Sequence, residues 1–278
     1  MSELPPLRDA MARVGLRADK RLGQHFLLDL NLTAKIARAA GNLRTGTTIE
    51  VGPGPGGLTR ALLAAGARVI AVERDERCRP LMDDLAAAYP GKLSVIWADA
   101  LAVDAHTLGE APRRIVANLP YNVGTELLIG WLDHAAAFES FTLMFQREVG
   151  ERLTAHPGTK SYGRLSVLAQ WLCTVEPAFT IGAKAFTPPP QVDSVVLRLV
   201  PRPQPLAPAA KNCLERVTAA AFGQRRKMLR QSLKSLAKDS GFMDGADFCA
   251  SANIDAELRA ENLSVEQFCA LARLAERA

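Results

Sequence analysis

The order of apolar and polar positions along the chain predicts strands and helices that alternate over roughly its first half. Short runs rich in β-branched and apolar residues, typical of buried strands, are separated by longer runs with apolar residues at helical spacing. The expected strands are 47–51, 68–72, 93–97, 114–117 and 141–145, and the expected helices are 58–65, 76–88, 125–134 and one capped by Asp29 or Asn31 that runs to Gly41. This alternation predicts βαβ units, and therefore an α/β fold with a parallel sheet covered by helices on both faces.

The pattern changes toward the C-terminus. Residues 192–200 alternate as a further strand, and 174–181 is a candidate antiparallel partner for it. Four closely spaced prolines in 201–208 then predict a boundary between a domain 1–202 and a domain 203–278. Beyond this boundary we expect helices only. Their patterns cover 209–221, 225–238, 244–252 and 264–276, the last opened by the capping-box pair Ser264 and Gln267.

The composition is that of an ordinary globular protein and excludes few functions. The chain has 278 residues and a formal net charge of +5, a mild basic excess. Its five cysteines are widely spaced and form no CxxC pair, which argues against a disulfide framework or a zinc site, so we expect reduced thiols and no metal. No apolar signal region opens the sequence, and no run approaches the ~18 apolar residues of a membrane span. We therefore expect a cytoplasmic protein.

A glycine-rich loop, Gly-Pro-Gly-Pro-Gly-Gly at 52–57, follows the first strand of the alternating series. Glycine lets the backbone turn sharply and approach a ligand closely. Gly52, Gly54 and Gly57 match the GxGxxG fingerprint of dinucleotide-binding sites. Because NAD and S-adenosylmethionine both bind at this point of such folds, the loop predicts a nucleotide-like cofactor but does not choose between them.

Acidic residues end the next two expected strands. Glu73 is suited to hold the two hydroxyls of a ribose, and Asp99 to accept a hydrogen bond from an adenine amino group. A nicotinamide enzyme would use the glycine loop and Glu73 but has less need of Asp99. The plainer interpretations are a ligand-free turn for the loop and a strand-end cap for Asp99.

The sequence Asn118-Leu119-Pro120-Tyr121 follows the fourth expected strand, at the same sheet edge as the glycine loop. The N6 amino group of adenine is a poor nucleophile because its lone pair is delocalised into the ring. The Asn118 side-chain oxygen and the Pro120 carbonyl can grip its N–H groups and favour a tetrahedral nitrogen, while Tyr121 stacks on the base. A sulfonium methyl donor is already activated, so positioning does most of the work. The loop therefore predicts N6 methylation by S-adenosylmethionine, with a generic turn as the alternative.

The sequence resembles the ribosomal RNA adenine N6-dimethyltransferase family, and within it the bacterial small-subunit (16S) branch. The motifs that carry the resemblance are Leu22-Gly23-Gln24-His25-Phe26-Leu27, the glycine loop, Glu73, Asp99, Asn118 to Tyr121, Gln146-Arg147-Glu148-Val149, Phe186-x-Pro188-x-Pro190-x-Val192-x-Ser194 and 222–233. The resemblance implies a Rossmann-like class I S-adenosylmethionine-dependent methyltransferase domain with a small C-terminal all-α domain. It also implies dimethylation of N6 of two adjacent adenosines near the 3′ end of 16S rRNA, and a role in small-subunit biogenesis.

The resemblance further implies roles for individual residues. The cofactor, S-adenosyl-L-methionine, is expected to contact His25, Leu27, Gly52, Gly54, Glu73, Asp99 and Asn118. His25 stands where many family members have asparagine, and either side chain donates a hydrogen bond. Phe186 is a second stacking face for the target base or, equally, a core residue. The implied partner is 16S rRNA within an immature small ribosomal subunit, bound by a monomer away from any membrane.

Basic residues recur at i+4 spacing along the helix expected over 225–238. They are Arg226, Arg230, Lys234 and Lys238, and Leu229, Leu233 and Leu236 form the apolar stripe of the same helix. Like charges at this spacing repel one another, and a polyanion relieves the repulsion. The pattern therefore predicts phosphate contacts from Arg226, Arg230 and Lys234, with a solvated basic face as the alternative.

Three other functions fit parts of the sequence. A 23S rRNA adenine N6-methyltransferase of the macrolide-resistance type shares both loops, but the 186–194 segment and the C-terminal helices favour the small-subunit enzyme. A non-catalytic RNA-binding assembly factor fits the basic residues, but both loops are intact. A nicotinamide dehydrogenase fits the glycine loop alone.

Overall fold

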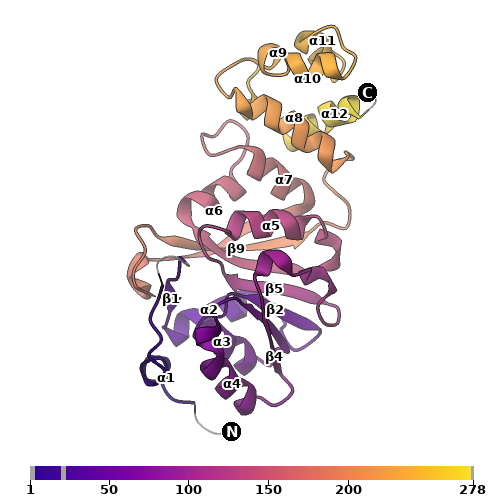
Figure 1. The fold of residues 1–278 in the computed structure, drawn as a ribbon. Coiled ribbons are helices and arrows are strands. Elements are labelled where there is room, and N and C mark those ends of the chain that lie inside the picture. Colours follow the sequence, from indigo (N-terminus) through magenta and orange to yellow (C-terminus); the bar gives the residue numbers. More distant parts are fainter. Residues whose placement is uncertain (1–3, 20–22, 277–278) are drawn as a thin grey trace. The chain divides into compact units, whose positions relative to one another are not determined.

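A computed structural model describes residues 4–19 and 23–276 of the chain (Figure 1). Leu22, the first residue of the N-terminal motif, lies outside the described residues. The chain forms two compact units, the first containing Met1–Gly150 and Glu176–Pro201 and the second containing Glu151–Val175 and Arg202–Ala278. The second unit thus resumes at Arg202, next to the boundary expected there, and it also takes in the earlier segment 151–175.

A seven-stranded sheet forms the centre of the first unit, and only residues 173–175, at the start of one strand, are assigned to the second. Its strands are β2 (Thr47–Val51), β3 (Val69–Glu73), β4 (Leu93–Trp97), β5 (Arg113–Asn118), β6 (Ser140–Gln146), β7 (Cys173–Ile181) and β9 (Ser194–Pro201), in the order β4-β3-β2-β5-β6-β9-β7. The strands from β4 to β6 pair in parallel, and β9 pairs antiparallel with β6. The expected α/β class and all seven expected strands are confirmed, and β7 lies beside β9 as predicted.

The sheet grows in both directions from the boundary between β2 and β5. β3 and β4 extend it on one side, and β5 and β6 on the other. The register sets Ile49 of β2 level with Ile115 of β5. The loops that leave the carboxyl ends of these two strands therefore begin side by side, at the position where sheets of this kind bind ligands. They are the glycine loop and the Asn118–Tyr121 loop.

Helices cover both faces of this sheet (Figure 1). Those of the first unit are α1 (Leu7–Arg13), α2 (Leu30–Ala39), α3 (Gly57–Ala64), α4 (Arg79–Ala88) and α5 (Gly124–Leu132), and α6 (Arg147–Thr154) runs on into the second unit. Buried side chains of α2, α3 and α4 share one hydrophobic cluster with Met144 of β6. α5 packs on the opposite face, because Trp131 stacks on Phe141, and strand residues three apart point to opposite sides. Asp29 caps α2 as predicted.

The N-terminal segment contributes elements that the hydrophobic pattern did not predict. Besides α1, they include the two-residue strand β1 (Phe26–Leu27), which pairs antiparallel with β8 (Phe186–Thr187). Strands this short show no periodicity, so only the fold reveals them. The small ladder joins the segment 23–27 to the segment 186–194, two parts of the chain that carry separate sequence motifs.

The second unit is built of helices. They are α7 (Arg164–Leu172), α8 (Lys211–Gly223), α9 (Leu229–Ser232), α10 (Lys234–Asp239), α11 (Gly245–Ala250) and α12 (Val265–Ala275). Ser264 and Gln267 form the predicted capping box at the start of α12. Phe222 of α8 lies between the rings of Tyr162 and Phe268, with ring centroids 6.0 Å and 5.4 Å away. Within the described chain, no helix combines the length and the apolar character that crossing a membrane requires.

The expectation of a single helix over 225–238 is wrong. Residues 224–228 form turns and an isolated bridge, and the helix that follows is interrupted between α9 and α10. The amides of Leu229 and Arg230 donate to carbonyls of the later segment 256–258, which replaces the bonds a continuous helix would make. The charges therefore do not form a regular i+4 array, and the argument built on its self-repulsion does not hold.

Candidate active site

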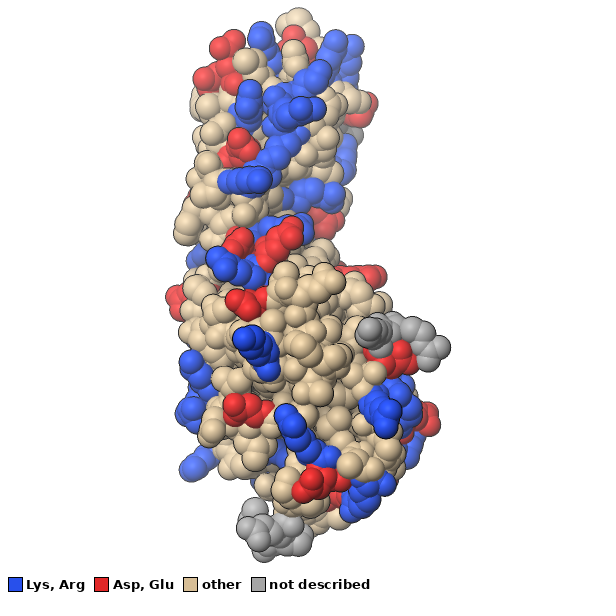
Figure 2. Space-filling view, turned by 90° about the vertical axis from the view of Figure 1, so that its left-hand side faces the viewer, with Lys and Arg blue, Asp and Glu red and all other residues tan. Residues whose placement is uncertain are grey.

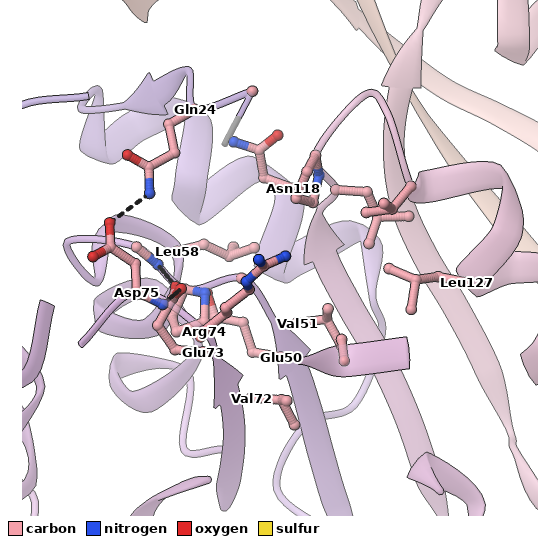
Figure 3. Close-up of a pocket in the computed structure, with 18 of the residues that line it drawn as sticks. Gln24, Glu50, Val51, Leu58, Val72, Glu73, Arg74, Asp75, Asn118 and Leu127 are labelled. Carbon is pink, nitrogen blue, oxygen red and sulfur yellow. Dashed lines mark hydrogen bonds between the residues drawn. The ribbon is translucent and has the colours of Figure 1, made fainter. Parts of the chain in front are cut away.

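A pocket of about 260 Å³ opens at the carboxyl ends of β2, β3 and β5 (Figure 3). Its walls are the glycine loop, the residues that follow β3 and β4, the loop after β5 and the segment 23–27. The expected residues that line it are His25, Leu27, Gly52, Gly54, Glu73, Asp99, Asn118, Pro120 and Tyr121. The structure thus brings together at one site residues that the sequence separates by almost a hundred positions.

The glycine loop packs against the chain's own N-terminal segment. A Cβ atom built on Gly54 would lie 3.1 Å from the Phe26 ring, and one built on Gly57 would lie 2.6 Å from the Leu27 carbonyl oxygen. Gly54 also adopts a φ of +54°, in the left-handed region that favours glycine. Glycine is therefore required here for the approach of the segment 24–27, as well as for any ligand.

Glu73 ends β3 with a buried carboxylate. Its Oε2 accepts from the amide of Gly54 over 2.8 Å, and its Oε1 accepts from the amide of Asp75 over 2.7 Å. Burial raises the pKa of Glu73, and the amide hydrogen bonds oppose that rise. Since each carboxylate oxygen has a further lone pair, Glu73 can still accept hydrogen bonds from the hydroxyls of a ribose.

Asp99 follows β4 and is half-exposed. Its Oδ1 accepts from the amide of Leu101 over 3.0 Å, and its Oδ2 lies 3.2 Å from Nη1 of Arg74. Asp99 is therefore a cap for the short turn of helix after β4, as the plainer interpretation held, and it lines the pocket as well. Arg74 lines the same pocket (Figure 3).

Asn118 ends β5 and lines the pocket with its side chain (Figure 3). Its Nδ2 donates to the main-chain carbonyl of His25 over 3.3 Å. Because a carbonyl oxygen only accepts hydrogen bonds, this contact fixes which end of the amide faces His25. Oδ1 is then the acceptor that the side chain offers to a ligand.

The carbonyl of Pro120 does not have the role expected of it. It accepts from the amides of Val123 over 3.2 Å and Gly124 over 3.0 Å, at the start of α5. Both of its lone pairs are therefore used by the chain itself. Within the described residues, these turn hydrogen bonds leave the preceding carbonyl, that of Leu119, as the acceptor beside Asn118. The role expected of the Pro120 carbonyl is therefore corrected, and Leu119 also lines the pocket.

Tyr121 is held from two sides. Its hydroxyl lies 2.7 Å from the Ser194 hydroxyl, and its ring stacks on that of His25 with centroids 5.4 Å apart. Burial raises the pKa of Tyr121, and the hydrogen bond with Ser194 opposes the rise. Nδ1 of His25 lies 2.8 Å from the carbonyl oxygen of Pro188, so Nδ1 carries a proton and donates it. These contacts join three distant segments around one aromatic ring.

Phe186 is a core residue and not a wall of the pocket. The residue is 3% exposed and belongs to a hydrophobic cluster with Leu27, Ile36 and Ile181. Its strand β8 pairs with β1, which directs the ring inward. Of the two interpretations that the sequence left open, the structure supports the core residue, and the second stacking face is corrected.

Several polar residues at the pocket, such as Glu50 and Gln24, were not among those expected from the sequence. Glu50, on β2 just before the glycine loop, lines the pocket and is 1% exposed. Gln24 donates from Nε2 to Oδ2 of Asp75 over 2.8 Å (Figure 3), and the hydrogen bond from Arg77 lowers the pKa of Asp75. A carboxyl group within an apolar strand was an available signal for Glu50, since burying one is costly. The Gln24 contact has no local signal.

The basic residues expected to bind RNA lie in the second unit. Figure 2 shows Lys and Arg side chains gathered over the part of the chain that Figure 1 labels α8 to α12. The exposed ones include Arg226, Lys227, Arg230, Lys234 and Lys238. Arg225 differs, because it pairs with Glu261 at 2.8 Å and donates to the carbonyls of Thr159 and Tyr162. Arg225 therefore stabilises the unit, while its neighbours face solvent.

Solved structures share this fold. The dimethyladenosine transferase of Plasmodium falciparum superimposes with a TM-score of 0.76 over 89% of this chain and 96% of that one, at 24% identity. The 23S rRNA methyltransferase ErmE superimposes with a TM-score of 0.67 over 90% of this chain and 99% of that one, also at 24% identity. Both agree with the expected class I methyltransferase fold.

Sequence comparisons find relatives that are far more similar to this chain than these two structures. Ribosomal RNA small subunit methyltransferase A of Rhodospirillum rubrum is 62% identical over 276 residues, which cover 99% of this chain and 94% of that protein. The protein of the same name from Paramagnetospirillum magneticum is 60% identical over 274 residues, 98% of this chain and 95% of that one. Residues 15–277 match the family described as ribosomal RNA adenine dimethylase. The chain therefore belongs to the ribosomal RNA adenine dimethylase family.

Proposed function

We propose that this chain transfers methyl groups to N6 of two adjacent adenosines near the 3′ end of small-subunit rRNA, within an immature subunit. The observation that carries the proposal is the position of Asn118. Its side chain ends β5 beside the glycine loop of β2, so an acceptor for an amino group lies at the wall of a nucleotide-sized pocket. The names of the relatives, small subunit methyltransferase A, support the choice of rRNA.

The pocket fits S-adenosylmethionine, the cofactor of this family. Glu73 has lone pairs for the ribose hydroxyls, and Asp99 is half-exposed where an adenine amino group can reach it. His25 and Leu27 close the N-terminal side, held there by the β1–β8 ladder and by the glycines that let them approach. A buried carboxylate oxygen of Glu50 lacks a hydrogen-bond partner in the described protein, which indicates a site built for a ligand.

S-adenosylmethionine supplies a methyl group on a sulfonium, which needs no further activation. The chain's own residues then have two tasks. Oδ1 of Asn118 and the carbonyl of Leu119 accept the two N–H hydrogens of the target amino group, which localises the nitrogen lone pair for in-line attack on the methyl carbon. As the N–C bond forms, the methyl–sulfur bond breaks and leaves a neutral thioether. The methylated nitrogen then loses one proton to solvent. Tyr121 stacks on the adenine and holds it out of its own strand, with its ring fixed by Ser194 and His25.

The RNA backbone is bound by the exposed basic residues of the second unit. Arg226, Arg230 and Lys234 remain the assigned phosphate contacts, although they do not share one continuous helix. Arg230 faces Glu257 only at 3.9 Å, an exposed pair worth little in water, so a phosphate can compete for it. The chain acts in the cytoplasm, as a monomer.

The test is methylation of immature small ribosomal subunits with a labelled methyl donor, followed by mapping of the modified nucleotides. We expect two adjacent N6-dimethyladenosines near the 3′ end of the small-subunit rRNA, and none with Asn118→Ala in the same time. A large-subunit rRNA fragment, offered in parallel, addresses the macrolide-resistance alternative. Label on that fragment alone, or binding to subunits without any methylation, would overturn the proposal.

A further inference from the structure

Glu50 is a buried acid, and none of the ion pairs formed among the described residues involves it. It lies on β2, two residues before Gly52, and its side chain lines the cofactor pocket (Figure 3). The residue is 1% exposed, and its Oε2 receives no hydrogen bond from the described residues. The Thr59 hydroxyl also meets no partner at full hydrogen-bond geometry, although as the donor beside Glu50 it opposes the rise in the pKa of that carboxyl. An ionised carboxylate in this position would be poorly solvated.

The other charged groups around the pocket do not neutralise it. Arg74 pairs with Asp99 at 3.2 Å, and Arg77 with Asp75 at 2.5 Å. The neighbouring acid Glu73 repels an ionised Glu50, and this repulsion adds to the effect of burial on the pKa of Glu50. Among the described residues, the remaining titratable side chains that line the pocket are His25 and Tyr121.

Glu50 and Glu73 differ in how the protein satisfies them. Both oxygens of Glu73 accept from backbone amides, of Gly54 and Asp75, which stabilise its ionised form. Glu50 has no such pair of donors, and burial raises its pKa from the ordinary 4.5 to about 8. Of the two acids, Glu50 is therefore the one whose negative charge the pocket does not stabilise.

We propose that the Glu50 carboxyl holds a proton in the cofactor-free protein and releases it to solvent when the cationic cofactor binds. S-adenosylmethionine carries a sulfonium, an ammonium and a carboxylate group, so it brings a net positive charge that replaces the proton as the neutralising charge. The proton on Glu50 and the cofactor then compete, and cofactor affinity rises with pH until Glu50 is ionised in the free protein. The inference rests on the proposed function for the identity of the ligand, but it does not depend on which RNA is methylated.

The test is calorimetric titration with S-adenosylmethionine at pH 7 in buffers of different ionisation enthalpy. The wild-type protein is expected to release close to one proton per cofactor bound, and its affinity to rise by up to about tenfold per pH unit below pH 8. Glu50→Gln, which keeps the shape and removes the titration, should release none and bind with little dependence on pH. No proton release by the wild-type protein, or equal release by Glu50→Gln, would overturn the inference.

Glu73→Gln is the matched control, since it removes the neighbouring acid of the same pocket. It should still release a proton, measured at raised protein concentration if binding weakens. Loss of the proton in Glu73→Gln together with its retention in Glu50→Gln would assign the proton to Glu73 and sink the proposal. Infrared difference spectra of the wild-type protein need no variant: cofactor binding should remove the carbonyl band of one protonated carboxylic acid, and an unchanged band contradicts the proposal.

Discussion

The side-chain amide of Asn118 donates to the main-chain carbonyl of His25 over 3.3 Å. One contact thereby joins the loop after β5 to the N-terminal segment that covers the glycine loop. It also fixes the orientation of the amide, since the reversed arrangement would set two oxygens against each other. Asn118 is therefore oriented before any substrate arrives, and its Oδ1 accepts no hydrogen bond from the described residues that would compete with an amino group.

Replacement of Asn118 by alanine tests this orientation. We expect Asn118→Ala to lower the rate of methyl transfer by on the order of 10²–10³-fold, the usual loss when one preorganised polar group is removed from an active site. Cofactor affinity should change far less, because the other contacts remain. Single-turnover methylation measures the rate and calorimetry measures the affinity. Asn42→Ala, an exposed asparagine just beyond α2, is the control. Equal rates for the two variants would contradict the role of Asn118.

His25 should act through the hydrogen bond that it donates. His25→Ala removes the bond from Nδ1 to the Pro188 carbonyl and the stacking on Tyr121. A hydrogen bond of this kind is worth about 0.5–1.5 kcal/mol, so cofactor affinity should fall by up to roughly tenfold. His25→Asn retains an N–H donor and should recover most of the loss. Calorimetry measures the cofactor affinity of both variants. Equal affinities for His25→Ala and His25→Asn would show that the hydrogen bond to Pro188 does not contribute to cofactor binding.

The sequence predicted the sheet of the first unit because its strands are buried and regular. β2, β3, β5 and β6 read as short apolar runs between helical patterns, and the structure reproduces them with ends shifted by a residue or two. The location of the candidate active site was predicted from the same alternation of strands and helices. Once two strands are parallel neighbours, the motifs that end them must meet at one edge, which is why Gly52 and Asn118 were brought together correctly.

Long-range contacts explain what the sequence could not predict. The chain from 225 to 238 has helical periodicity, but amides of Leu229 and Arg230 bond to a later segment, and local spacing does not report such competition. Phe186 occupies the core because β8 pairs with β1. The carbonyl of Pro120 is used by the first turn of α5. In each case the sequence showed which residue was present, but it did not show which distant residue would contact it.

The hydroxyl pair of Tyr121 and Ser194 should be coupled energetically. Tyr121→Phe and Ser194→Ala each remove the 2.7 Å hydrogen bond, and each is expected to lower the free energy of unfolding by about 0.5–1.5 kcal/mol. The double variant should cost clearly less than the sum, because the second change has no bond left to remove. Urea denaturation of the four proteins gives the coupling. Strictly additive losses would mean that the hydroxyls do not interact.

Glu50 also predicts how stability depends on pH. Its pKa in the folded protein is about 8, above the ordinary 4.5 expected in the unfolded chain. Between these values the folded state binds the extra proton, so the contribution of Glu50 is complete below about pH 4.5 and is lost as pH rises toward 8. The loss is at most about 1.4 kcal/mol per pH unit. Urea midpoints of the cofactor-free protein should therefore fall more steeply with pH than those of Glu50→Gln, and parallel curves would contradict the raised pKa.

Charge reversal in the second unit tests the assigned phosphate-binding residues. Arg226→Glu and Arg230→Glu should weaken binding to small-subunit rRNA, and each should reduce the slope of log affinity against log salt by about one, because one phosphate is no longer neutralised. Both side chains are exposed, so folding should be unaffected. Lys92→Glu is the matched control, because Lys92 is equally exposed but lies just before β4, at the sheet edge away from the pocket. Filter-binding or fluorescence titrations over a range of salt concentrations measure the slope. If the two arginine variants and Lys92→Glu reduce it equally, the effect is one of net charge, and the RNA-binding residues must be sought elsewhere on the chain.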